Sequence, residues 1–169
     1  MALESAQQNP LEIVREDHSG EPSKTFCGHC GRSPEDHDGP QAGARVCSKC
    51  GMGLMLQAPA KIAPKTTDPF MVIDGSLTIC ALSREAEKLL AISETDAVNR
   101  HVGEFLVPGD AETSRGENLA TLLAFAARGE ANDANVVVRP ANTFGVRYWA
   151  RVGPCGPPNA ALLVLADAR

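Results

Sequence analysis

The chain of 169 residues, 43% of them hydrophobic and with a formal net charge of −5, is long enough for one domain with a smaller module and has the apolar residues for a sizeable core. The acidic balance argues against a general nucleic-acid binder, and no apolar run is long enough to cross a membrane. The N-terminus also lacks the pattern of a signal peptide, so a soluble cytoplasmic protein without membrane contacts is expected.

Residues 1–24 carry charged and small polar side chains without periodicity, which predicts a flexible arm. Residues 25–56 then contain two Cys-x-x-Cys-Gly motifs, at 27–31 and 47–51. Two such turns can place four thiolates around one tetrahedral ion, and the glycines let the backbone turn closely around the sulfurs. This segment resembles a zinc ribbon, in which metal–ligand bonds supply the folding free energy. The predicted ligands of a structural zinc ion are Cys27, Cys30, Cys47 and Cys50.

Other uses of these cysteines stay open. A Cys-x-x-Cys pair can be a redox dithiol, and a rubredoxin-like site of four cysteines holds iron. The duplicated motif favours a metal over a dithiol, and zinc is favoured over iron. His29 and His37 are further candidate ligands, but four cysteines already fill a tetrahedron, so His29 is expected to face solvent. A closed site of this kind is structural rather than catalytic.

Residues 57–68 are rich in proline and have no periodicity, which predicts an extended linker before a second domain at 69–169. That domain opens with expected strands at 71–73 and 77–80, joined by the turn residues 74–76. Apolar residues then recur at helical spacing, with Ser83 placed as the N-cap. The remaining predicted elements are a short helix at 93–98, a long helix at 117–128, and strands at 136–139, 145–152 and 160–165.

The stretch VIDGSLTICALSREAEKLLAIS resembles the opening of a PAS domain. That opening consists of an apolar strand, an Asp-Gly turn, a second strand, and a helix that follows a small polar residue. Ser83 stands where many family members have asparagine. Two strands, helices and three strands over residues 68–169 also follow the order of that family. The resemblance implies an α+β fold with a five-stranded antiparallel sheet and helices on one face, in a domain that senses or docks.

The resemblance also implies a ligand site between the inner face of the sheet and the helices. The candidate wall residues are mostly aliphatic, so the expected ligand is a small apolar molecule such as a fatty acid. The alternative is that the same face is a packed, ligand-free core. The candidate residues are Ile79, Leu90, Phe105, Leu106, Leu119, Leu122, Leu123, Val138, Tyr148 and Leu163.

Haem and flavin are not expected. His101 is the one histidine of the second domain and is interpreted as a surface or capping residue rather than an axial haem ligand. The Asn-Cys-Arg-Phe-Leu motif of flavin photosensors is absent. The sequence also has no Ser-His-Asp order and no phosphate-binding glycine loop, so enzyme activity is not expected.

Arg147, Trp149 and Arg151 alternate along one predicted strand, on the face turned away from the helices. An exposed tryptophan between arginines is typical of an interface, so this stripe is predicted to bind a protein partner or a second copy of the chain. The alternative is that the linker or the zinc module covers Trp149.

The sequence therefore predicts a non-enzymatic signalling or regulatory protein, with a PAS-like domain for a ligand or partner and a zinc ribbon for docking or output. One alternative is a small transcription regulator whose ribbon contacts nucleic acid. The few basic residues near the cysteines are interrupted by Glu35, Asp36 and Asp38, which favours protein contact. A second alternative is a redox switch, in which mild oxidation forms disulfides and releases the metal.

Overall fold

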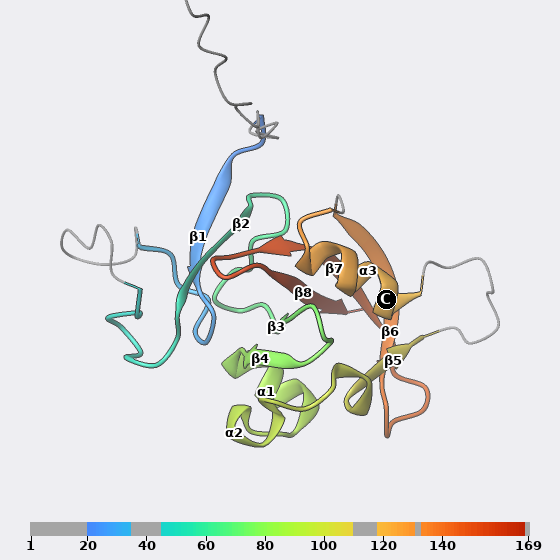
Figure 1. Ribbon diagram of the computed structural model, residues 1–169. Coiled ribbons are helices and arrows are strands. Elements are labelled where there is room, and N and C mark those ends of the chain that lie inside the picture. Colours follow the sequence, from blue (N-terminus) through green and yellow to red (C-terminus); the bar gives the residue numbers. More distant parts are fainter. Residues whose placement is uncertain (1–19, 35–44, 110–117, 131–132, 168–169) are drawn as a thin grey trace, which may run out of the picture.

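A computed structural model describes residues 20–34, 45–109, 118–130 and 133–167, and Figure 1 shows how their elements are arranged. Helices cover one face of a six-stranded antiparallel sheet, and a two-stranded sheet packs against its other face. Residues 1–19 of the predicted flexible arm lie outside the described residues, as does His37. None of the described helices has the length and hydropathy needed to span a membrane.

The larger sheet contains one strand more than the five expected, although the antiparallel α+β architecture is as predicted. The additional strand, β5 (Leu106–Pro108), pairs with β6 at the edge of the sheet. Three residues are too few to show a periodic pattern, and they form a strand because β6 offers them a pairing edge. The strands in spatial order are β4 (Ile79–Leu82), β3 (Phe70–Ile73), β8 (Ala160–Asp167), β7 (Tyr148–Cys155), β6 (Ala134–Pro140) and β5.

The predicted hairpin and the helix after it are both present, although the second strand spans Ile79–Leu82 and not 77–80. Hydrogen bonds from side chains stabilise both elements. Asp74 Oδ1 accepts the backbone N–H of Thr78 at 3.0 Å and so closes the turn between β3 and β4. Ser83 Oγ accepts the N–H of Ala86 at 3.2 Å, as an N-cap does. The same oxygen accepts the N–H of Phe70 at 2.9 Å, which joins the start of the helix to β3.

The first hydrophobic core lies between the sheet and the helices. Helix α3 packs on β7 and β8 and buries Leu119, Leu123 and Ala126, which recur at helical spacing. His101 caps the short helix η2, since its Nδ1 accepts the N–H of Gly103 at 3.0 Å. The helices are α1 (Arg84–Leu90), α2 (Glu94–Ala97), the 3₁₀ helix η2 (Val102–Glu104) and α3 (Leu119–Ala127).

A second hydrophobic core lies on the other face of the sheet, under β1 (Ser23–Cys27) and β2 (Met55–Pro59). The ring of Phe26 meets the ring of Phe70 edge to face, with centroids 5.7 Å apart. Gln57 and Gly156 exchange backbone hydrogen bonds of 2.6 and 3.0 Å, which join β2 to the loop after β7. The cysteine module is therefore packed on the sheet and not merely tethered to it.

Residues 57–68, predicted as an extended linker, contribute to this second core. The first of them belong to β2, and Ile62 is only 1% exposed. Arg151 of β7 donates to the backbone oxygen of Lys61 at 2.9 Å and lies 3.6 Å from the carboxylate of Asp68. Prolines interrupt the periodicity of this segment, but they do not prevent its side chains from being buried.

Candidate metal centre

The four predicted metal ligands come together at one end of the two-stranded sheet. The sulfur atoms of Cys27, Cys30, Cys47 and Cys50 all lie within 4.8 Å of one another. Cys27 and Cys47 are buried, while Cys30 and Cys50 are half-buried. Two sulfur–sulfur distances show the closeness of the set, 3.6 Å from Cys27 to Cys50 and 3.8 Å from Cys30 to Cys47.

Each Cys-x-x-Cys-Gly motif forms a tight turn that ends at its glycine. Gly31 donates to the backbone oxygen of Cys27 at 2.9 Å, and Gly51 donates to that of Cys47 at 2.8 Å. Both glycines have a positive φ, 70° and 68°, which side chains disfavour. A third glycine, Gly53, gives the sulfurs room, because a Cβ there would overlap the sulfur of Cys27.

Backbone N–H groups point at the sulfurs. Those of His29 and Cys30 lie 3.4 Å from the sulfur of Cys27, and that of Gly53 lies 3.4 Å from the sulfur of Cys50. Such donors favour the thiolate form and orient the ligands of a metal.

The cysteine thiols differ in acidity. Burial raises the pKa of Cys27 and of Cys30 above the usual value of a thiol. Burial acts in the same direction at Cys50, but the N–H groups of Gly53 and Met52 and the neighbouring thiols outweigh it and lower the pKa to about 6. A bound cation would stabilise all the thiolates together. Four sulfur donors in a closed set suit zinc or iron and leave no position for a substrate.

His29 does not face solvent, contrary to the expectation from its place between two ligands. Its side chain is buried, with 6% of the residue exposed, and its Nδ1 lies 2.8 Å from Oε2 of Glu94 in α2. The other oxygen of Glu94 accepts the N–H of Leu82 at 3.1 Å, and the backbone oxygen of His29 accepts the N–H of Arg84 at 3.1 Å. The first cysteine turn is therefore bonded to the junction of β4 and α1 and to α2.

Replacing Glu94 with alanine is expected to lower the free energy of unfolding by about 1–3 kcal/mol, because the buried ring of His29 and the N–H of Leu82 lose their acceptor. Urea unfolding of the zinc-loaded protein measures this loss. The matched control is Glu85→Ala, which removes a surface carboxylate that pairs with Lys88 and is expected to cost less than about 0.5 kcal/mol. Equal losses in the two variants would contradict a structural role for the His29–Glu94 contact.

The structure brings the predicted wall residues of the ligand site together in the first core. Seven of them are buried members of this core, with at most 8% of the residue exposed, and Leu90, Phe105 and Tyr148 pack against it half-buried. Their role in binding a ligand stays a prediction.

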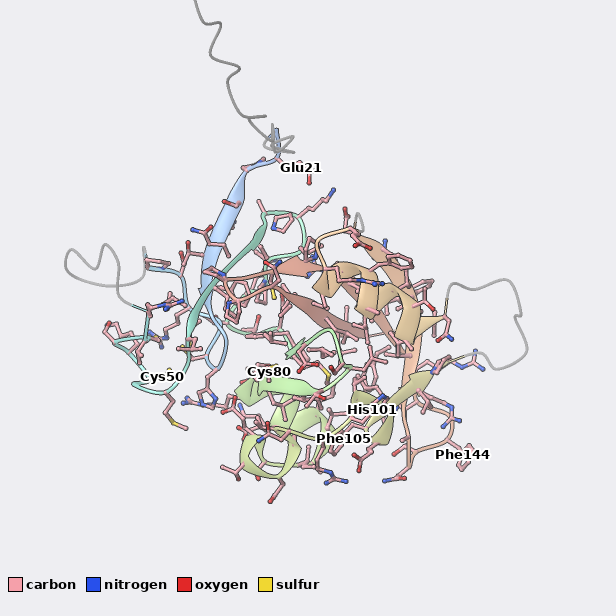
Figure 2. The ribbon with its side chains drawn as sticks, in the orientation of Figure 1. Glu21, Cys50, Cys80, His101, Phe105 and Phe144 are labelled. Atoms are coloured by element: carbon pink, nitrogen blue, oxygen red, sulfur yellow. The ribbon has the colours of Figure 1, made fainter. Side chains whose placement is uncertain are left out.

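The three residues of the predicted interface stripe lie in different surroundings. Arg151 is held by the backbone of residue 61, whereas Trp149 is 50% exposed and Arg147, which lies before β7, is also exposed. The structure adds Phe144, 86% exposed, in the loop between β6 and β7, where the guanidinium of Arg139 lies 5.2 Å from its ring centre. In Figure 2 Phe144 lies at the opposite side of the molecule from Cys50. An aromatic residue in a turn-rich segment was the available sequence signal for it.

No family model matches the chain, and no curated protein matches it. Among solved structures it is similar to the PAS domain of the nitrogen regulation protein NR(II) from Vibrio parahaemolyticus, at 14% identity over 60% of this chain and 90% of that one, with a TM-score of 0.45. It is also similar to a PAS domain from Colwellia psychrerythraea, at 20% identity over 60% of this chain and 86% of that one, with a TM-score of 0.45. A third similar structure is the PAS domain of an HTR-like protein from Haloarcula marismortui, at 16% identity over 60% of this chain and 86% of that one, with a TM-score of 0.44. These similarities concern the fold alone.

Proposed function

We propose that this chain is a non-enzymatic signalling or regulatory protein. Its larger sheet and helices bind a small apolar ligand or a protein partner, and its zinc-bound cysteine module serves docking or output. The observation that carries the proposal is the contact of His29 with Glu94, because it joins the metal-binding turn to the helices over the first core.

The helices near this contact are also part of the first core. Ala86 of α1 and Ala97 of α2 are buried in it, and Leu90 packs against it. A ligand that displaced α1 or α2 would move Glu94, and with it the turn that carries Cys27 and Cys30. Occupancy of the first core can thus alter the surface around the metal through the hydrogen bond between Glu94 and His29.

The buried polar side chains have hydrogen-bond partners within the fold. Among the described residues these are His29 and Ser83, and both make structural hydrogen bonds, to a carboxylate and to backbone N–H groups respectively.

The second cysteine turn presents a surface suited to a protein partner. Val46, Met52 and Leu54 are 49%, 66% and 51% exposed around it. The exposed Arg45 and Lys49 lie beside them and keep the alternative of nucleic-acid contact open. A steep dependence of DNA binding on salt concentration would favour that alternative.

Native mass spectrometry of the protein purified from cells, without added ligand, is expected to show one zinc ion per chain together with a retained apolar metabolite or partner. The same spectra give the number of subunits.

If the exposed face around Trp149 joins two copies, Trp149→Ala is expected to convert a dimer to a monomer with its zinc retained. Spectra without any metal would contradict the proposed zinc module, and a dimer unchanged in the variant would exclude this face as the interface.

A further inference from the structure

Among the described residues, strand β1 pairs with another strand along one edge only, and its other edge is free. Its partner is β2, with Lys24 opposite Ala58 and Phe26 opposite Leu56. The N–H of Cys27 points away from β2, since it bonds to the backbone oxygen of Arg32 at 2.9 Å. Backbone direction alternates along a strand, so the N–H and C=O groups of Ser23 and Thr25 also point away from β2. Within the described part of the chain, these groups have no hydrogen-bond partner.

A groove of about 470 Å³ runs along this free edge. Its lining also includes Gly31 at the end of the first cysteine turn, Ser33 and Pro34 after it, and residues 63–66. The free backbone groups of β1 therefore line a groove rather than a flat surface. An edge strand beside such a groove can accept an added strand.

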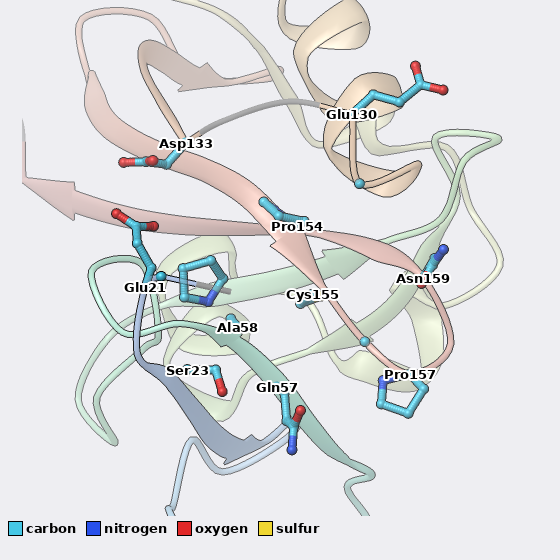
Figure 3. Close-up of a pocket in the computed structure, with 14 residues that line it drawn as sticks. Glu21, Ser23, Gln57, Ala58, Glu130, Asp133, Pro154, Cys155, Pro157 and Asn159 are labelled. Carbon is cyan, nitrogen blue, oxygen red and sulfur yellow. The ribbon is translucent and has the colours of Figure 1, made fainter. Parts of the chain in front are cut away.

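The groove carries positive charge. Its lining includes Lys24 and Lys65 and no acidic residue, and neither lysine forms an ion pair among the described residues. Another groove, of about 890 Å³, has the opposite charge, since Glu21, Glu130 and Asp133 line it (Figure 3). The chain as a whole is acidic, so the basic groove stands apart from the average surface.

We propose that the groove beside β1 binds an extended acidic peptide segment of a partner protein, which pairs with Ser23 and Thr25 as a third strand of the small sheet. The backbone groups of the peptide meet the free edge, and its carboxylates meet Lys24 and Lys65. This inference rests on the docking role proposed for the cysteine module and names its site and the class of partner.

Residue-resolved amide exchange of the zinc-loaded full chain tests the free edge first. The amides of Ser23 and Thr25 are expected to exchange fast, and those of Lys24 and Phe26, which bond to β2, to exchange slowly. Slow exchange at Ser23 and Thr25 in the protein alone would overturn the proposal, because another part of the chain would then already occupy the edge.

The probe is a synthetic hexapeptide of alternating glutamate and valine. It is expected to slow exchange at Ser23 and Thr25 by about tenfold or more at about 1 mM peptide. The same peptide with N-methyl groups along one edge, and a peptide with lysine in place of glutamate, are expected not to bind. Binding by the N-methylated peptide, or no effect of the acidic peptide on a protein that holds its zinc, would overturn this inference and leave the proposed function standing.

Thr25→Pro removes the outward N–H and is expected to weaken peptide binding about tenfold, since proline is tolerated at a free edge. If this variant loses its zinc, the double variant Lys24→Glu and Lys65→Glu tests the proposal through charge alone. It is expected to weaken binding of the acidic peptide by the same factor. Lys88→Glu, on α1 away from the groove, is the control and is expected to bind the peptide like the unchanged protein. Undiminished binding in the double variant would overturn the proposal.

Discussion

Replacing Cys27 with serine is expected to abolish metal binding and to unfold the two-stranded module. Cys27 is completely buried, and its sulfur receives two backbone N–H groups and lies 3.6 Å from the sulfur of Cys50. A serine oxygen cannot replace a thiolate ligand at this closed site. The neighbouring Phe26 would lose its position in the second core, so the expected loss in free energy of unfolding exceeds about 4 kcal/mol.

Zinc content per chain and thermal unfolding measure this effect. A loss of this size corresponds to a fall in Tm of about 10 °C for a chain of this length. Cys80→Ser is the matched control, because the thiol of Cys80 is exposed on β4, and Figure 2 shows it apart from Cys50. The control is expected to keep its metal and its Tm. A Cys27→Ser protein that still held one zinc ion per chain with an unchanged Tm would refute the assignment of the site.

Replacing Phe70 with alanine is expected to cost about 3–5 kcal/mol of unfolding free energy. Phe70 is 1% exposed on β3, and its ring meets that of Phe26 at 88° across the second core. The substitution leaves a cavity between the cysteine module and the sheet. Metal binding is expected to persist, because the ligands are held by their own turns, while amide exchange in β2 becomes faster.

Urea unfolding measures this loss in free energy, provided that its dependence on urea concentration is the same in the variant and the unchanged protein. Zinc content per chain shows whether the cysteine module still binds its metal. Phe144→Ala removes the same ring from a side chain that is 86% exposed and contacts Arg139. It is expected to cost no more than about 1 kcal/mol. Equal unfolding midpoints for the two variants would show that the second core contributes little to stability.

Local interactions account for the parts of the molecule that the sequence predicted well. The cysteine tetrad follows from two short motifs, each of which closes its own turn through a glycine of positive φ. The turn at Asp74 and the cap at Ser83 likewise use hydrogen bonds over two to four residues. Such interactions can be inferred because residue type and spacing determine them.

Contacts between distant residues account for what was missed. His29 was expected to face solvent, but it meets Glu94, which lies 65 residues further along the chain. β5 was not expected as a strand because its pairing partner, β6, lies about thirty residues away in the sequence. Residues 57–68 were expected to be extended, and their burial depends on the outer face of the sheet.

The sequence by itself determined the candidate metal ligands, the order of the helices and of the strands of the larger sheet other than β5, and the apolar inner face of that sheet, because each depends on spacing within a short stretch. Only the tertiary structure decided that the cysteine module packs on the outer face, that His29 bonds to α2, and that Trp149 stays exposed while Arg151 is held. The physical reason is that burial on the second face depends on which segments meet there. The periodicity and motif spacing of a segment do not specify which other segment packs over its surface.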